Sequence, residues 1–251
     1  MTAINAHTIL LTFLVFCRIG GCLMLMPGYS SQRVPVHVRL FLALAITLAL
    51  APLLVPALKQ VLPDLPPAMA ARLVVSETLI GAIFGVMGRI FLLALQFMGT
   101  AAAYFIGFSG MTDSPVEEAE PAPAVATLLT LTATVLLFVA DLHVDVLRAL
   151  VASYSLLHVT DFFDAQFALA KLTDASSDAF FLVAQLVSPF LVYSLAINFL
   201  FGIANKLVPQ IPVYFISFPF VLAGGLVLLY FTFSECLRLF MAGFQAFLAN
   251  G

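Results

Sequence analysis

The 251-residue sequence predicts an all-α membrane protein. Hydrophobic residues make up 63% of the chain and charged residues only 9%, which leaves too little polar surface to cover a soluble domain. Long apolar runs recur, and most approach the roughly 20 residues that a helix needs to cross a bilayer. These runs lack the alternating pattern of a membrane barrel, and a lone strand in lipid would leave its backbone unpaired, so helices are expected.

Apolar runs bounded by charges and prolines define the expected helices: 8–27, 40–58, 73–111, 121–140, 179–204 and 207–234. Arg18 lies inside the first run, where an arginine costs roughly 3 kcal/mol and offsets most of the apolar gain. The run 73–111 carries Glu77 and Arg89 and is too long for one crossing, yet short for two. Such charges must face protein, water or one another, so these helices are either re-entrant hairpins or not simple lipid-facing spans.

Small residues at helical spacing predict close helix packing. Gly81 and Gly85 form one such pair, and Gly99, Ala103 and Gly107 form a second stripe four residues apart. Small side chains let helix backbones approach closely where lipid removes the hydrophobic drive for association.

Two polar segments interrupt the apolar pattern. Residues 107–123 combine three prolines with four acidic residues, which ends the preceding helix and predicts a loop. Residues 141–178 mix charges with apolar residues at helical spacing, which predicts amphipathic helices at an interface or against a partner. Basic residues nowhere form the dense cluster that a nucleic-acid partner requires.

Catalytic signals are few, and no catalytic residue, cofactor or metal ligand is assigned. The sequence lacks the motifs of metalloproteases, P-loop NTPases and dinucleotide-binding enzymes. The tetrapeptide at 107–110 leaves an intramembrane serine protease as a remote alternative, with Ser109 as nucleophile and His143 or His158 as base. Asp141 and Asp145 share a helix face that His143 does not, so the three cannot converge on one metal.

The segment from Gly202 to Ile216, GIANKLVPQIPVYFI, resembles a C-terminal signature of the FliR family and of its counterparts in type III secretion export gates. Asn205, Lys206, Pro209 and Gln210 match its core, with Lys206 in place of the commoner arginine. Segments 16–52 and 76–85 match other parts of the family pattern in order, with Arg18, Pro27, Arg39 and Glu77 among the matching positions. The segment at 140–154 departs from the pattern, because only His143 of an expected histidine pair is present.

The resemblance implies a noncatalytic subunit of the flagellar protein-export gate, in the inner membrane at the flagellar basal body. FliR-like proteins assemble with FliP-like and FliQ-like subunits, and an FlhB-like export protein is a further expected partner; unfolded flagellar proteins are the expected substrates. By analogy, residues 1–178 are FliP-like and residues 179–251 form a FliQ-like helical hairpin. An injectisome subunit, or a solute-transporter or ion-pathway subunit, stays open as an alternative.

The resemblance also assigns roles to three groups of residues. The family has a loop that plugs the closed pore, which here implies Phe105, Gly107, Phe108, Gly110 and Met111. Arg18, Glu77 and Arg89 are expected to be buried charges in the assembly. The hairpin tip and assembly contacts are expected at Asn205, Lys206, Pro209, Gln210 and Pro212, because two prolines there favour a turn.

Overall fold

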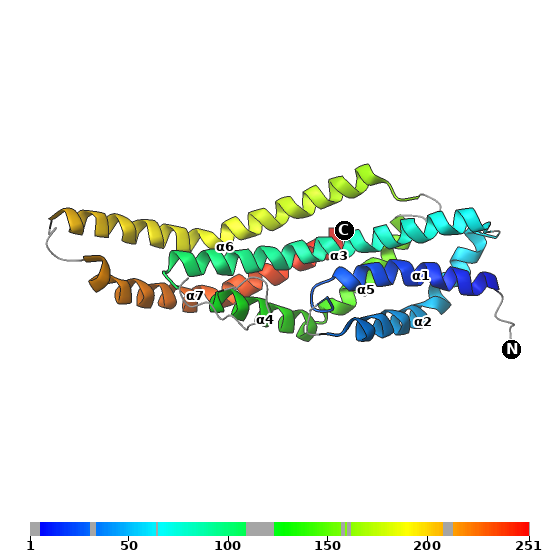
Figure 1. The fold of residues 1–251 in the computed structure, drawn as a ribbon, viewed down its shortest axis with the longest axis horizontal. Helices are drawn as coiled ribbons and strands as arrows, with labels where there is room; N and C mark the ends of the chain where they lie inside the picture. The colour runs from blue at the N-terminus through cyan, green and yellow to red at the C-terminus, as the bar shows by residue number, and fades with distance from the viewer. Residues whose placement is uncertain are drawn as a thin grey trace. The chain divides into compact units, whose positions relative to one another are not determined.

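The computed structural model describes residues 6–30, 34–63, 65–108, 123–156, 159, 162–207 and 213–250. These parts of the chain form seven helices (Figure 1). Their bounds are α1 Ala6–Leu25, α2 Val36–Val61, α3 Pro67–Phe105, α4 Ala124–Val139, α5 Leu142–Leu156, α6 Ala165–Leu207 and α7 Val213–Asn250.

The all-α membrane fold predicted from the sequence is confirmed. Five of the described helices are long and apolar enough to cross a membrane: α1, α2, α3, α6 and the part of α7 from Ser217 to Leu248. The short helices α4 and α5, separated by a break at Ala140 and Asp141, count as a sixth span only if taken together.

The chain divides into two compact units. Unit 1 comprises residues 1–90, 141–176 and 247–251, and unit 2 comprises residues 91–140 and 177–246. Helices α3, α6 and α7 each contribute to both units, so the units are made of helix segments rather than of consecutive stretches of chain. The expected division at residue 178, which rests on family likeness, stays a prediction.

In unit 1, α1 and α3 run parallel and in unusually close contact. A Cβ atom on Gly81 would collide with the backbone of Arg18, and one on Gly85 would lie 2.6 Å from the carbonyl oxygen of Cys22. Just after the end of α1, the sulfur of Met26 would lie 2.5 Å from a Cβ on Gly88. The predicted small residues of α3 therefore let the backbone of α1 pack directly against them. These glycine contacts fix the register of the two helices.

In unit 2, α6 and α7 form an antiparallel hairpin. Gly243 of α7 faces Leu182 of α6, and Gly224 faces Tyr193, so the contacts move in opposite directions along the two helices. The Tyr193 hydroxyl donates a hydrogen bond of 2.7 Å to the carbonyl oxygen of Val221. Phe190, Phe240 and Phe244 are fully buried in this unit, and Phe91 of α3 packs edge-on against Phe244.

The helix boundaries differ from the expectation at three places. Instead of a helix or re-entrant hairpin over 73–111, the structure has one 39-residue helix that begins six residues earlier, at Pro67, and ends at Phe105. Helix α6 begins at Ala165 and passes through residue 178 without a break, because Asp174 and Asp178 are exposed and a helix accommodates charges on its outer face. Helix α7 continues beyond 234 to Asn250, with Glu235 and Arg238 paired on its exposed side.

Candidate functional site

A left-handed glycine ends α3 inside unit 2. Gly107 has φ of 76°, and its N–H donates to the carbonyl oxygen of Tyr104 at 3.2 Å. The N–H of Phe108 donates to the carbonyl oxygen of Ala103 at 2.8 Å. This pair of bonds is a Schellman motif, which satisfies the last carbonyls of a helix and requires a residue that tolerates positive φ. The chain therefore leaves the helix in a direction fixed by Gly107.

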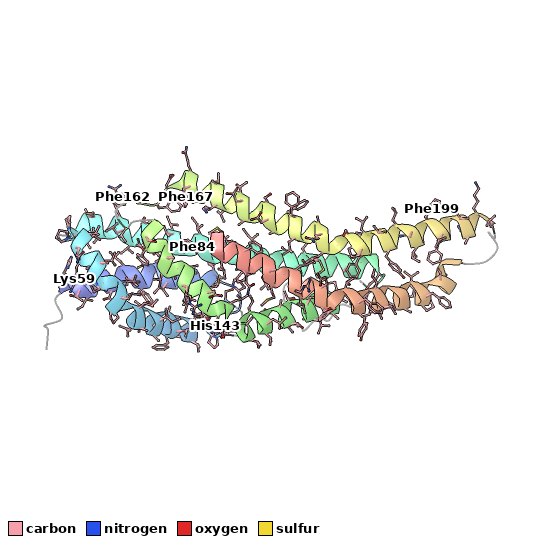
Figure 2. All side chains as sticks on the ribbon, turned by 180° about the vertical axis from the view of Figure 1, so that it is seen from behind. Lys59, Phe84, His143, Phe162, Phe167 and Phe199 are labelled. Carbon is pink, nitrogen blue, oxygen red and sulfur yellow. The ribbon has the colours of Figure 1, made fainter. Side chains whose placement is uncertain are left out.

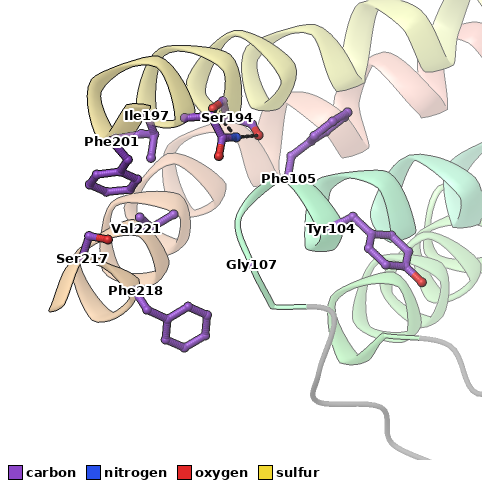
Figure 3. Close-up of a pocket in the computed structure, with 10 residues that line it drawn as sticks. Tyr104, Phe105, Gly107, Ser194, Ile197, Phe201, Ser217, Phe218 and Val221 are labelled. Carbon is purple, nitrogen blue, oxygen red and sulfur yellow. Dashed lines mark hydrogen bonds between the residues drawn. The ribbon is translucent and has the colours of Figure 1, made fainter. Parts of the chain in front are cut away.

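A cavity of about 150 Å³ lies beside this helix end, between α3, α6 and α7 (Figure 3). Its walls are mostly aromatic or aliphatic, with a few hydroxyl and amide groups. The lining residues are Tyr104, Phe105, Gly107, Ser194, Ile197, Asn198, Phe201, Ser217, Phe218 and Val221.

The polar groups of the cavity come from α6 and α7. The Asn198 amide donates to the carbonyl oxygen of Ser194 at 2.8 Å and to its Oγ at 3.2 Å. Ser217 is buried, whereas Tyr104 is 64% exposed and is the one ionisable side chain among the ten lining residues. The cavity can thus hold apolar or hydrogen-bonding groups, and its described lining lacks the acid–base pair that catalysis would need.

Glycines let the three helices meet at the level of this cavity. A Cβ on Gly225 of α7 would collide with Ile106, which is fully buried at the end of α3. A Cβ on Gly224 would lie 2.5 Å from the Tyr193 hydroxyl. The end of α3 is therefore wedged against α7 by a contact that only glycine permits.

The structure brings some of the predicted plug residues to this cavity. Phe105 and Gly107 line it, and Phe108 is half-buried directly after the helix end. Gly110 and Met111 lie outside the described residues, as does Ser109. Sequence reasoning missed Ser194, Asn198 and Ser217, although the first two form a polar pair one turn apart within an apolar helix and were recognisable as such.

Two of the three predicted buried charges are paired within the chain. Arg18 and Glu77 are 0% and 1% exposed, and they form a bidentate ion pair with N–O distances of 2.5 and 2.8 Å. Removing one partner of such a pair leaves a buried charge uncompensated, which typically costs about 3–5 kcal/mol. Arg89 is exposed on α3. Burial of these residues in an assembly stays a prediction.

The remaining predicted residues lie at helix ends or outside the described chain. Asn205 and Lys206 are exposed in the last turn of α6. Pro209, Gln210, Pro212 and His158 fall outside the described residues, and His143 is half-buried on α5 in unit 1. Among the residues that the structure does describe, no group of three or more His, Cys, Asp or Glu side chains could hold a metal ion.

Comparison with known proteins identifies the family. The family described as bacterial export proteins, family 1, matches residues 9–247. The chain belongs to this family. It is 30% identical to the flagellar biosynthetic protein FliR of Caulobacter vibrioides over 229 residues, which cover 90% of this chain and 89% of that protein. It is 28% identical to the FliR protein of Escherichia coli, over 87% of this chain and 82% of that protein.

Family membership agrees with the resemblance seen in the sequence. This export protein is a component of flagellar biosynthesis, and its apolar helices fit a place in the bacterial inner membrane within the flagellar apparatus. The family is a structural part of the export apparatus and is not a known class of enzyme.

Proposed function

We propose that this chain is a structural subunit of the flagellar export gate, in which it lines a channel for unfolded proteins together with FliP-like and FliQ-like subunits. An FlhB-like export protein is a further proposed partner. The flagellar version is favoured over the injectisome version because the relatives that it matches are named as flagellar proteins.

The observation that carries the proposal is the fixed end of α3 at an aromatic-lined cavity. The left-handed glycine fixes where the chain leaves the helix, Ile106 packs tightly against Gly225, and three phenylalanines line the cavity at this point, which supports a sealing role. We propose that Phe105, Gly107 and Phe108, with Gly110 and Met111, start the segment that closes the channel.

Exposed aromatic side chains support contact with other subunits. Several on α6 and α7 are more than two thirds exposed in the isolated chain: Phe180, Phe181, Phe199, Phe215, Phe220 and Phe231. Phe199 projects away from the α6–α7 hairpin (Figure 2). Lipid can cover aromatic side chains. The exposed polar residues Asn198, Asn205 and Lys206 of α6 are costly to place in lipid, so the polar and aromatic residues together support contact with other subunits.

The antiparallel α6–α7 hairpin supports the proposed FliQ-like part at residues 179–251. In this scheme residues 1–178 are the FliP-like part, and one chain acts as a fusion of two subunit types. Purification of the intact chain tests the partnership: it should recover a large complex with two other small membrane proteins. Recovery of a stable monomer with solute-uptake activity would instead favour the transporter alternative.

The sealing role is tested by deleting residues 107–110 and measuring the leak of small ions across the membrane. A leak above that of the intact protein is expected, because the segment that follows α3 would start in the wrong place. Replacing Lys59, which is exposed in the last turn of α2, by Ala serves as the control and should leave the membrane tight. A tight membrane in the deletion variant would refute the plug.

A deletion strain separates the two secretion systems. Loss of motility with normal effector secretion is expected for a flagellar subunit. Loss of effector secretion with normal motility would show that the chain is an injectisome subunit instead.

A further inference from the structure

Helix α5 is too short to cross the membrane by itself. It has 15 residues, or about 22 Å of helix, whereas the hydrocarbon core is about 30 Å thick. It is also amphipathic, because Arg148 and Asp145 pair on its exposed side. Its buried residues show that it also packs within the protein, and unit 1 supplies the polar contacts.

The buried face of α5 changes from apolar to polar residues along the helix. Leu142, Val146 and Leu150 are buried one turn apart and provide apolar contact. The stripe then ends on a polar residue, Ser153, which is 1% exposed, and on its neighbour Tyr154. A buried hydroxyl such as that of Ser153 requires a hydrogen-bond partner, and the group that supplies it also packs against the ring of Tyr154.

That partner is the guanidinium group of Arg18. Its Nε and Nη2 atoms bind the Glu77 carboxylate, and its Nη1 donates to Ser153 Oγ at 3.0 Å. The Ser153 hydroxyl in turn donates to the carbonyl oxygen of Leu150 at 2.6 Å. The flat face of the guanidinium lies 3.8 Å from the centroid of the Tyr154 ring, within cation–π range.

The same strip of α3 also holds the chain that follows α5. Ser76, next to Glu77, accepts a hydrogen bond of 2.7 Å from the Phe163 backbone N–H. One turn earlier, the Arg72 guanidinium lies 4.4 Å from the centroid of the Phe162 ring. Phe162 and Phe163, which lie shortly before α6, are thus held by two polar residues of α3.

We propose that Arg18 is the clasp that docks α5 onto a preformed α1–α3 pair, with Ser153 and Tyr154 as the positioning residues. The packing of α1 on α3 depends on the glycine contacts at Gly81, Gly85 and Gly88, whereas the docking of α5 depends on the Arg18 clasp. The clasp acts within unit 1 and does not depend on the proposed role in export.

Thiol labelling of the full-length chain in membranes tests the clasp. Cys17, Cys22 and Cys236 are buried free thiols, so Cys22 can report on the α1–α3 contact once Cys17 and Cys236 are replaced by Ala. A Val146→Cys substitution in a chain whose three native cysteines are Ala reports on α5. A membrane-permeant maleimide then measures how often each site opens.

The informative variants remove the clasp without leaving a lone buried charge. In Arg18→Leu/Glu77→Leu, and separately in Ser153→Ala/Tyr154→Leu, labelling at position 146 should rise about tenfold or more, while Cys22 stays protected. Ser153→Thr keeps a hydroxyl and should restore protection relative to Ser153→Ala. Arg148→Leu, which removes the exposed ion pair of the same helix, is the matched control and should change neither rate.

Two results would overturn the proposal. If position 146 stays protected in both double variants, apolar packing alone docks α5. If Cys22 and position 146 become reactive together, the Arg18–Glu77 ion pair stabilises the whole of unit 1, and Arg18 is not a clasp specific to α5.

Discussion

Glycine has opposite roles at different positions of this chain. At Gly85 and Gly81 any side chain would enter the backbone of α1. At Gly202, in the interior of α6, a Cβ would meet nothing within 4 Å. The first two positions are therefore required by packing within the chain, whereas the last only lowers the stability of its helix by about 0.5–1 kcal/mol relative to alanine.

Matched glycine substitutions should separate these roles. Gly85→Ala is expected to destabilise the purified chain by about 1–3 kcal/mol, because its methyl group would lie 2.6 Å from the Cys22 carbonyl oxygen. Gly202→Ala should be neutral or slightly stabilising. Thermal unfolding in detergent, followed by circular dichroism, measures both; equal effects would contradict the close packing of α1 on α3.

Single and paired substitutions of the buried ion pair should not add. Glu77→Leu leaves the Arg18 guanidinium buried without its carboxylate and is expected to cost about 3–5 kcal/mol. Adding Arg18→Leu should recover most of that loss, since two apolar side chains of similar size can replace a buried pair. Unfolding midpoints of the three proteins measure the coupling, and a double variant less stable than the single one would contradict it.

At the scale of the element, the end of α3 is set by one residue. Gly107 adopts positive φ, which costs a residue with a Cβ about 1–2 kcal/mol. The two Schellman bonds of Gly107 and Phe108 depend on that conformation. The element is thus stopped by backbone geometry, and its last turn presents Tyr104 and Phe105 to the cavity.

Gly107→Ala should therefore fray the last turn of α3 and loosen the seal that we propose. The expected result is an ion leak smaller than that of the 107–110 deletion. Gly107→Asn is the matched variant, because asparagine tolerates positive φ better than alanine, and it should leak less. A leak equal in both variants would show that the conformation of this residue does not matter.

Elements and their order followed from the sequence more closely than their ends did. The apolar runs predicted helices close to α1 and α3, and the glycine stripe predicted a close helix contact, because lipid and backbone sterics act on local patterns; that α1 is the partner of α3 required the fold. The start of α6 at Ala165 was missed, since Lys171, Asp174 and Asp178 suggested a separate amphipathic segment. The pairing of Arg18 with Glu77, Ser153 and Tyr154 joins distant residues and required the fold.

At the scale of the whole molecule, the chain leaves apolar and basic groups exposed that its own fold does not cover. Lys206 and Lys59 make a useful comparison, because each is exposed in the last turn of a long helix, α6 and α2 respectively. Each opposes the negative end of its helix dipole, so loss of either charge costs a similar small amount, about 0.3–1 kcal/mol. Any larger difference between them must arise outside the chain.

Lys206→Glu is expected to impair assembly or export, whereas Lys59→Glu should not. Both variants should retain the helix content and unfolding temperature of the unaltered chain to within a few degrees. Copurification with the other membrane subunits and swimming motility measure the difference. Equal motility in the two strains would contradict an assembly role for the tip of the α6–α7 hairpin.

The spacing of Arg18 and Glu77 along the chain also has a consequence during translation. The two residues are 59 positions apart, and bacterial ribosomes add about 5–20 residues per second. Glu77 is therefore synthesised roughly 3–12 s after Arg18. During that time α1 carries an uncompensated cation, which makes its insertion into the membrane unfavourable. We expect stalled nascent chains that lack residue 77 to leave Cys17 open to thiol reagents, and longer ones to protect it.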